Sequence, residues 1–452
     1  MTHAVATEPQ EVRNLRWRMI GLLYFTYLCY YLPRKADAIT KSSLQSDLKF
    51  SLEDLALADT SYLLTYTFAL FASGMVGSRI PSNFMLFGGL CGVALCSLLK
   101  SMATTPMMFC VVQALHAVFQ STGWPTCIKV LATYVHPATR GTTMGFWTTC
   151  QSLGGVAGTI AGTWFLTEYH SWVFAYQYHI PILVIMAVAD LMLIRDDPPK
   201  ELSEYFAVKH EPAVTPAGTV ESVEEPTNIT LSQVVALPGV LQVGTSYFFL
   251  KFLRYALLFW LPFYYETELG YDRSTSSLVS TSFELGGTIG TPLIGYVSDQ
   301  YMNSKRDLTA GLFMGAASLT LLACIVLSGS GPAINGLCMF LTGILVIGPD
   351  SVLSGTLAQD IGQRSKLGKG AVGSVAGLLN SMGSAGSVFQ SGATAYISKQ
   401  FGWDALFLGF VSCSLASAGI LIQVANASKP SNMPWVQFLS PTRKAKEEGE
   451  EN

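Results

Sequence analysis

The chain has 452 residues, of which 50% are hydrophobic and only 13% are charged, and its mean hydropathy is +0.39. Soluble globular domains normally carry about 25% charged residues. The net charge of −3 carries no indication of nucleic-acid binding. These values exclude an ordinary soluble domain and indicate a polytopic membrane protein.

The cysteines and the N-terminus exclude several further classes. All nine cysteines lie in apolar segments without metal-ligand spacing, so we expect small buried apolar residues and no disulfide framework. Residues 1–18 hold no apolar core and no small-residue cleavage site, so no cleaved signal peptide is expected. We find no nucleophile with a base and no metal spacing, and therefore expect no enzyme, metal ion or cofactor.

Apolar runs recur along the whole chain. About 20 helical residues are needed to cross roughly 30 Å of hydrocarbon. Runs of that length cover residues 17–40, 56–79, 83–103, 106–132, 142–167, 171–195, 236–265, 274–299, 308–329, 333–356, 370–397 and 403–425. They predict an all-α membrane protein with twelve transmembrane helices.

A polar segment between the sixth and seventh runs divides the chain. It begins with Asp196-Asp197-Pro198-Pro199 and continues with a Pro-, Glu-, Val- and Thr-rich stretch that cannot bury a core. We predict a cytoplasmic N-terminus (1–16), a six-helix bundle (17–195), a cytoplasmic linker (196–235), a second six-helix bundle (236–425) and a cytoplasmic tail (426–452).

The orientation follows from the loop cations. With a cytoplasmic N-terminus, about 17 of the 27 Lys and Arg residues fall on the cytoplasmic side and about five on the far side. Both termini are therefore expected in the cytoplasm. The glycosylation sequons that begin at Asn228 and Asn426 would lie there too, and we expect neither to be modified.

Cations occur where hydrocarbon is expected. The first run ends in Tyr30-Tyr31-Leu32-Pro33-Arg34-Lys35, and a charge at membrane depth costs roughly 2.5–3.5 kcal/mol on insertion scales. Cations at a helix end can instead reach the headgroups. A second group of cations in the other half of the chain favours a functional site over this alternative. Lys251 and Arg254 lie inside the seventh run, and Arg254 follows Arg34 by 220 residues. Matched cations in two half-chains predict one anion site between the halves.

Glycine and proline positions repeat at a similar offset. Gly74–Arg79 is matched by Gly295–Gln300, 221 residues later, and Gly123-Trp124-Pro125 by Gly348-Pro349. The pair Gly154-Gly155 is matched by Gly383 and Gly386. Such residues allow close helix approach and bending. Parallel repeats with a midplane site between them are the layout of major facilitator transporters.

Four stretches carry a resemblance that covers nearly the whole chain. They are Tyr30–Lys35, Gln120–Cys127, Arg254–Pro262, and Gly348-Pro349 followed by Lys366–Gly370. The chain resembles the organophosphate:phosphate antiporter branch of the major facilitator superfamily, which includes bacterial glycerol-3-phosphate and hexose-phosphate carriers and eukaryotic sugar-phosphate exchangers. The exchangers of the endoplasmic reticulum look most similar, so that membrane is expected, with a plasma or other organelle membrane as alternatives.

The resemblance implies that Arg34 and Arg254 bind the phosphoryl group. A guanidinium group matches phosphate with two parallel hydrogen bonds and stays charged in a dry cavity. Lys35 is implied to pair with carboxylates of the opposite half. Glu284 matches one of these carboxylates, and Phe259 replaces the other.

The resemblance also implies roles for cavity residues. Tyr66 and Trp124 match aromatic residues that line the cavity, although Trp124 could be a packing anchor alone. Gln151 stands where bacterial members carry a His, and Leu70 where they carry a cavity Lys. Gln151 can still donate to phosphate.

Other polar residues have two interpretations. Lys251 is an extra cation one turn from Arg254, and we expect it to face the substrate. Asn380 would contact the substrate or bond to a neighbouring helix. Lys129 would reach the cavity or the cytoplasmic surface, Asp37 would cap Arg34, line the cavity or face the exterior, and Asp350 would pair with a nearby cation.

The expected function is exchange of a phosphate ester of the glucose-6-phosphate or glycerol-3-phosphate class for inorganic phosphate, by alternating access in a lipid bilayer. The protein is expected to act as a monomer, without a nucleic-acid partner. One alternative is a proton-coupled carrier of a small organic anion, with Glu284 or Asp37 as the titratable residue. Another is a non-transporting sensor or scaffold that binds a partner through the linker or the acidic tail.

Overall fold

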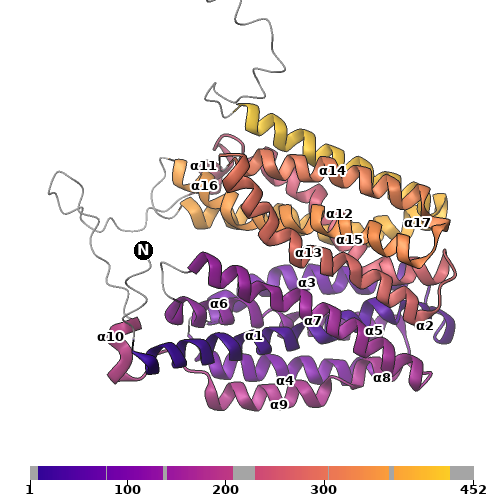
Figure 1. Ribbon diagram of the computed structural model, residues 1–452. Coiled ribbons are helices and arrows are strands. Elements are labelled where there is room, and N and C mark those ends of the chain that lie inside the picture. The colour runs from indigo at the N-terminus through magenta and orange to yellow at the C-terminus, as the bar shows by residue number, and fades with distance from the viewer. Residues whose placement is uncertain are drawn as a thin grey trace, which may run out of the picture.

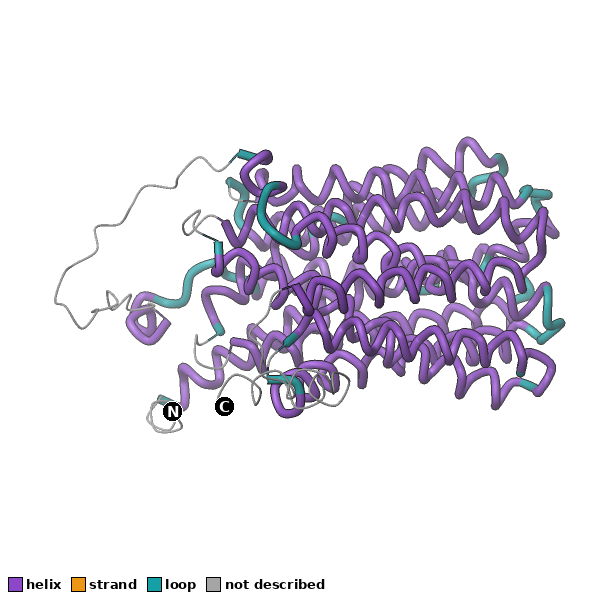
Figure 2. Tube along the Cα trace, turned by 90° about the horizontal axis from the view of Figure 1, so that it is seen from above, coloured by secondary structure: helices purple, strands orange, loops and turns teal. Residues whose placement is uncertain are grey.

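The computed structural model describes residues 9–427 except 78, 136–139, 207–229, 304 and 366–370. The described part of the chain is helical and contains no strand (Figure 2). Three predictions concern residues outside this part: the stretch 366–370, the sequon that begins at Asn228, and the acidic tail.

Helices of the first half follow the first six apolar runs, apart from two short helices, Lys41–Asp47 and Ser203–Phe206, which lie outside these runs. The helices are α1 (Gln10–Ile39), α2 (Lys41–Asp47), α3 (Leu52–Gly77), α4 (Ser82–Ser101), α5 (Pro106–Gln120), α6 (Gly123–Tyr134), α7 (Arg140–Glu168), α8 (Trp172–Gln177), α9 (Ile180–Leu193) and α10 (Ser203–Phe206). Two of the expected helices are each divided in two, at Ser121-Thr122 and at Tyr178-His179. The second break precedes Pro181 in the first turn of α9, where a proline is tolerated.

Helices of the second half follow the other six runs, apart from two short helices, Leu231–Val235 and Leu357–Arg364, which lie outside these runs. The helices are α11 (Leu231–Val235), α12 (Val240–Thr267), α13 (Arg273–Tyr301), α14 (Arg306–Val326), α15 (Pro332–Ser351), α16 (Leu357–Arg364) and α17 (Ala371–Ala427). A π-helical turn, Val352–Thr356, joins α15 to α16. Two expected helices form α17 and meet at Gly402, whose φ of 82° lies in a region that glycine adopts without strain.

The two halves form separate groups of roughly aligned helices (Figure 1). In the first half α1 packs on α7, α3 on α5, and α4 on α9. In the second half α12 packs on α17, α13 on α15, and α14 on α17. The halves touch mainly where α7 meets α13, α3 meets α17, and α1 meets α12.

Glycines make the closest of these contacts possible. A Cβ on Gly154 of α7 would lie 2.7 Å from the carbonyl oxygen of Leu28 in α1. A Cβ on Gly386 of α17 would lie 2.2 Å from the carbonyl oxygen of Phe248 in α12. The repeated glycines therefore serve the same purpose in each half, since both let a helix approach the backbone of the cation-bearing helix.

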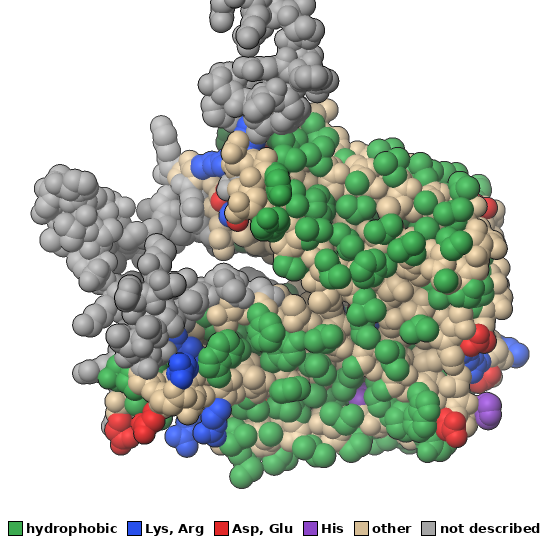
Figure 3. All heavy atoms as spheres, viewed as in Figure 1, with side chains coloured by type: hydrophobic (Ala, Val, Ile, Leu, Met, Phe, Trp, Pro, Cys, Tyr) green, Lys and Arg blue, Asp and Glu red, His purple; other side chains and the backbone are tan. Residues whose placement is uncertain are grey.

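The outer surface suits a lipid environment. Five helical stretches are long and apolar enough to cross a membrane: Ser82–Ser101, Trp172–Leu193, Arg306–Val326, Pro332–Gly362 and Ser374–Ala427. Large apolar side chains such as Phe68, Ile185 and Met192 are exposed, and Figure 3 shows apolar side chains along the flank with charged ones near the ends. That all twelve runs cross the membrane stays a prediction.

The halves close on each other at one end of the molecule and separate at the other. Three contacts join them at the closed end: Thr163 donates to Ser277 (2.6 Å), Ser42 to Glu266 (2.6 Å), and Lys399 to Glu53 (2.5 Å). At the end that carries α6 and α16 the space-filling view is hollowed between the halves (Figure 3). The start of α1 and the end of α17 lie toward this open end (Figure 1).

A candidate anion site between the two halves

Arg34 lies in α1 among three tyrosine rings. Its Cζ atom is 4.8 Å from the ring centre of Tyr31, 5.3 Å from that of Tyr66 and 5.7 Å from that of Tyr62. We call these three rings the tyrosine cage. Within the described ranges Arg34 makes no ion pair and no hydrogen bond, although its side chain is only 9% exposed.

This environment prepares Arg34 for an anion. A buried cation without a partner is costly, and each cation–π contact offsets about 0.5–2 kcal/mol of that cost. The ring faces attract the guanidinium group but leave its N–H donors unused. An anionic ligand that enters the site would find these donors free.

The matching face of α12 carries the second set of cations. Tyr27, Tyr31 and Arg34 of α1 correspond, 220 residues later, to Tyr247, Lys251 and Arg254. Such i, i+4, i+7 positions share one helix face. Lys251 Nζ lies 4.7 Å from the ring centre of Tyr247, and no carboxylate pairs with Lys251 in the part of the chain that the structure describes.

Arg254 differs from Arg34 because it has a carboxylate partner. Its Nη1 atom donates to Oδ2 of Asp350, the next-to-last residue of α15. The sequence had suggested that Asp350 would pair with a nearby cation, and the structure identifies this cation as Arg254. The Nε of Arg254 and the Oδ1 of Asp350 are buried without a hydrogen-bond partner.

The two arginines face a common space. Tyr31 of α1 and Tyr255 of α12 each interact electrostatically with both guanidinium groups. Gln151 of α7 accepts a 2.8 Å hydrogen bond from the Tyr31 hydroxyl, which orients this ring toward the space. Arg34, Arg254 and Gln151, which the sequence had placed in one site, therefore surround Tyr31 from both halves.

The remaining predicted cavity residues divide into two kinds. Tyr66 belongs to the tyrosine cage, whereas Trp124 supports the site from behind through ring contacts to Tyr27 (5.4 Å) and Trp147 (5.5 Å). Asn380 donates to the carbonyl of Ala376 in its own helix at 3.1 Å, and it bonds to no described cation. This bond lies within α17 and is not the interhelical bond considered for Asn380, whose contact with the substrate stays a prediction.

Lys35 of α1 and Glu284 of α13 form an ion pair between the halves. Lys35 Nζ lies 2.9 Å from Glu284 Oε2, and both side chains are at least 91% buried. The contact is an ion pair rather than a well-aligned hydrogen bond, since the same Oε2 has no hydrogen-bond partner. Gly155 makes room for the carboxylate, because a Cβ there would lie 2.3 Å from Glu284 Oε1.

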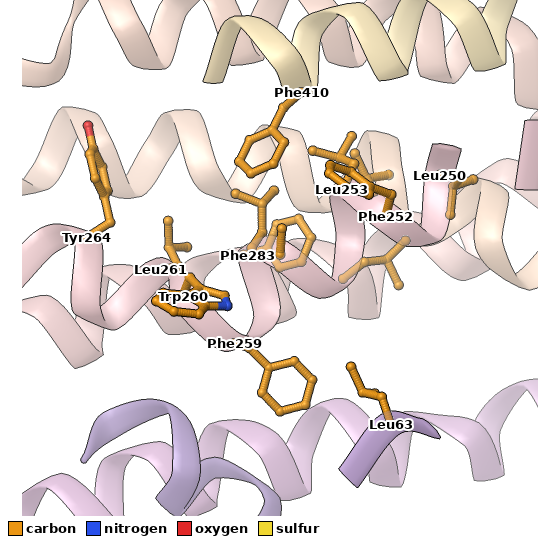
Figure 4. Close-up of a cluster of buried hydrophobic side chains, with 14 of the residues drawn as sticks. Leu63, Leu250, Phe252, Leu253, Phe259, Trp260, Leu261, Tyr264, Phe283 and Phe410 are labelled. Carbon is orange, nitrogen blue, oxygen red and sulfur yellow. The ribbon is translucent and has the colours of Figure 1, made fainter. Parts of the chain in front are cut away.

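Phe259 fills the place where the resemblance implies a second carboxylate. Figure 4 shows its ring pointing from α12 toward α3, which carries Leu63, and both residues are buried. Phe259 and Leu63 belong to one cluster of buried apolar residues, so an apolar side chain takes the place of a second charge.

A cluster of buried polar residues in the first half was not predicted from the sequence. Lys100 of α4, which is fully buried, donates to Asp37 (2.9 Å) and Gln113 (3.0 Å), and its Nζ lies 2.9 Å from Nδ1 of His116. Tyr176 also donates to Asp37, at 3.1 Å. Asp37 therefore does not cap Arg34 or line the cavity. Lys100 lies near the end of an apolar run, and no local sequence pattern links it to Asp37.

Lys129 lies outside the site. It pairs with Asp196 at 3.2 Å near the end of the bundle and is 39% exposed. Of its two interpretations, the surface position matches the structure.

The arrangement can bind a small dianion. Arg34 and Lys251 carry no counter-ion among the described residues, Arg254 shares one carboxylate, and the three cations come from two halves that separate at one end. A ligand bound between them would touch both halves at once. Such a site suits a carrier more than a catalyst.

Comparison with known proteins identifies the family. Residues 23–391 match the model of the Major Facilitator Superfamily. The chain belongs to this superfamily. Membership makes it a multi-pass membrane transporter and agrees with the all-helical fold.

Several relatives of this chain are named as transporters or exchangers of phosphate esters. It is 27% identical to the putative glycerol-3-phosphate transporter 2 of Arabidopsis thaliana, over 89% of this chain and 85% of that one. It is 28% identical to sugar phosphate exchanger 3 of Bos taurus, over 81% and 79% of the two chains. A glucose-6-phosphate exchanger of Mus musculus is 25% identical, over 89% and 90%.

Solved structures of other facilitators share the fold. A bacterial homologue of the human lysosomal transporter Spinster, in an inward-facing and occupied conformation, superposes with a TM-score of 0.64. It covers 91% of this chain and 95% of its own at 14% identity, so the likeness concerns the fold alone.

Proposed function

We propose that this facilitator exchanges a phosphate ester for inorganic phosphate by alternating access. The ester belongs to the glucose-6-phosphate or glycerol-3-phosphate class, in keeping with the names of the relatives. The observation that carries the proposal is Arg34, a buried guanidinium group without a counter-ion among the described residues, which has the tyrosines Tyr31 and Tyr255 as electrostatic neighbours in common with Arg254 of the opposite half.

The exchange follows from charge. An empty site holds Arg34, Lys251 and Arg254 against a single carboxylate, so bringing the halves together at the open end would confine unbalanced positive charge. A bound phosphoryl group offsets that charge and permits closure. Phosphate and its esters both do so, and a ligand shifts the equilibrium between the two conformations only by its differential affinity for them. Exchange is therefore favoured over net flux.

The proposal includes the membrane arrangement. All twelve runs cross the bilayer as two six-helix bundles, 17–195 and 236–425, joined by the linker 196–235. Both termini lie in the cytoplasm, so the open end faces the cytoplasm. The protein works as a monomer, and the endoplasmic reticulum is the proposed membrane.

A proton-coupled carrier of an organic anion gains no support. Its candidate titratable residues were Glu284 and Asp37, and each carboxylate is already paired with a lysine, Lys35 and Lys100 respectively. A non-transporting sensor has no need for an unpaired Arg34.

The decisive experiment measures uptake of labelled phosphate into liposomes that contain the purified protein. The liposomes are preloaded with phosphate, glucose-6-phosphate, glycerol-3-phosphate or nothing. We expect uptake only into preloaded liposomes, and its loss in the variants Arg34→Ala and Arg254→Ala.

The matched control is Arg306→Ala. Arg306 also pairs with a carboxylate, Asp360 at 2.9 Å, but lies at the start of α14, outside the site. This variant should retain exchange. Uptake that is equal with and without preloading, or that is unchanged in both Arg34→Ala and Arg254→Ala, would refute the exchange mechanism.

A further inference from the structure

The two arginines of the site are not equivalent, although they occupy matched positions. Arg34 is held by the tyrosine cage and has no counter-ion among the described residues. Arg254 is held by Asp350. When Pro125 of the first half is matched with Pro349 of the second, the residue that corresponds to Asp350 is the uncharged Thr126. Only the second half therefore brings its own anion into the site.

The pair between Arg254 and Asp350 is incomplete. One nitrogen of the guanidinium group contacts one carboxylate oxygen, while Arg254 Nε and Asp350 Oδ1 are buried without hydrogen-bond partners. A permanent arginine–carboxylate pair commonly uses two parallel hydrogen bonds. Buried ion pairs stabilise a protein only when the remaining donors and acceptors are also satisfied. The ion pair between Arg254 and Asp350 therefore has the geometry of a temporary contact rather than of a permanent structural one.

The backbone around Asp350 is also irregular. Pro349 has no N–H to donate to the carbonyl of Leu345, and the π-helical turn Val352–Thr356 follows almost at once. Such turns are frequent at functional sites and disturb the helix register. By contrast, the preceding part of α15 is fixed, since a Cβ on Gly343 would lie 2.0 Å from the carbonyl oxygen of Phe283 in α13.

We propose that Asp350 is a positioning residue: it acts as an internal counter-ion that neutralises Arg254 in the empty site and yields this arginine to the phosphoryl group of the substrate. The proposal rests on the proposed function and goes beyond it. Arg34 and Lys251 bind the dianion first, because no carboxylate has to leave them. Arg254 then exchanges Asp350 for a phosphoryl oxygen, and on release Asp350 returns to Arg254.

This role makes a prediction that is opposite to that of a structural pair. If Asp350 competes with the substrate, its neutral replacement should strengthen phosphate binding and slow release. In Asp350→Asn we therefore expect the apparent KM for phosphate exchange to fall about tenfold, the size of one charge-assisted hydrogen bond, and the maximal exchange rate to fall as well. If Asp350 only holds Arg254 in place, the apparent KM should rise.

The experiment uses the full-length protein in liposomes that exchange phosphate for phosphate. Asp350→Glu, which keeps the charge, should keep an apparent KM at or above that of the wild type. Asp360→Asn is the matched control. Asp360 lies in α16, outside the site, and its carboxylate pairs with Arg306 of α14. This variant should leave both kinetic constants unchanged.

A second measurement, of phosphate binding by thermal unfolding, tests the role of Asp350 even if a variant transports too little phosphate for kinetics. Phosphate should raise the Tm of detergent-purified Asp350→Asn at concentrations about tenfold lower than for the wild type, and Asp350→Ser should behave in the same way if the Asn variant does not fold. An unchanged or weaker phosphate response in a folded variant overturns the role of Asp350. A wild type that binds and exchanges no phosphate would instead refute the proposed function, so the two failures can be told apart.

Discussion

At the scale of single residues, the site is defined by which cations lack a partner. Eight ion pairs occur among the described residues, and they neutralise Lys35, Lys41, Lys100 and Arg254 within the interior. Arg34 and Lys251 remain without a carboxylate among the described residues, and they lie on matching faces of α1 and α12. In a buried interior, an unpaired cation is the stronger indication of an anionic ligand.

Lys251 gives the first prediction at this scale. It lies in the site without a counter-ion, so its charge is available to the substrate, whereas a solvated surface cation contributes at most about 1 kcal/mol. We expect Lys251→Gln to raise the apparent KM for phosphate about tenfold, the size of one charge-assisted hydrogen bond. Lys129→Gln, which breaks an exposed pair with Asp196, should leave it within about twofold. Equal effects of the two substitutions would argue against a substrate contact for Lys251.

Asp196 gives a pH-dependent prediction. Partial burial acts to raise its pKa, but hydrogen bonds from Ser82 and Lys129 outweigh burial and hold the pKa below its ordinary value. Its Oδ2 accepts from the backbone N–H of Ser82, the first residue of α4, at 3.1 Å. A lowered pKa means that the stabilisation is complete above the ordinary pKa of about 3.9 and is lost as the pH falls through the lowered value.

Thermal unfolding of Asp196→Ala should show this dependence. At neutral pH we expect a loss of about 1 kcal/mol, which is typical of a removed helix cap. The difference from the wild type should shrink as the pH falls below about 4. A difference that stays constant from pH 7 to pH 3 would mean that the carboxylate charge is not its source.

The sequence predicted the site residues better than their partners. Arg34, Arg254 and Lys251 stand out because charges interrupt apolar runs at a repeated offset. The tyrosine cage was only partly predicted: Tyr66 was expected to line the cavity, but Tyr62 was not singled out, since tyrosines are common in membrane helices. The pairing of Lys100 with Asp37 could not be predicted, because 63 residues separate them and nothing local links them.

At the scale of the helices, glycines in α7 determine how closely α1 approaches. Gly154 faces the backbone of Leu28, and a Cβ added at Gly158 would lie 3.0 Å from the carbonyl oxygen of Leu32. Because backbone cannot move aside as a flexible side chain can, any Cβ on this face must push the helices apart. α1 carries Arg34, so the displacement would reach the site.

Gly154→Ala tests this packing. We expect a loss of about 1–3 kcal/mol in stability, the usual cost of overpacking a well-packed core, and a lower Tm. Gly21→Ala is the control, since a Cβ on Gly21 of α1 would have no neighbouring atom within 4 Å. That variant should be as stable as the wild type or slightly more stable, because alanine favours helix. Similar Tm values for both variants would contradict the packing.

Helix positions followed the apolar runs closely, but their interruptions did not. The run 171–195 contains the short α8 and then α9, and the run 333–356 passes into a π-helical turn. Average hydropathy reports that a segment is apolar and contains no information on helix register. The prolines Pro181 and Pro349 were visible in the sequence, yet a proline can begin a helix, as in α9, or lie inside one, as in α15.

At the scale of the whole molecule, alternating access requires the closed end to open. Thr163 of α7 and Ser277 of α13 join the two halves there through a 2.6 Å hydrogen bond between their hydroxyl groups. Cysteines at both positions should form a disulfide under oxidation. We expect oxidised Thr163→Cys/Ser277→Cys to lose exchange and to regain it on reduction.

The control is a similar pair within one half. Ser246 of α12 and Ser417 of α17 have hydroxyl oxygens 2.7 Å apart, and alternating access does not separate them. The oxidised double variant Ser246→Cys/Ser417→Cys should keep exchanging phosphate. If the disulfide between the halves leaves exchange intact, the halves do not have to part at this end.

The buried charge pairs of the first half also constrain how the protein is made. Asp37 of α1 pairs with Lys100 of α4, and Lys41 of α2 pairs with Asp59 of α3. Each of these charges alone in hydrocarbon would cost roughly 2.5–3.5 kcal/mol on insertion scales. The first helices to leave the ribosome therefore cannot settle in lipid one at a time at low cost. Asp37 must stay out of the hydrocarbon until α4 has been synthesised and Lys100 can pair with it. We therefore expect α1, α2, α3 and α4 to insert into the membrane together.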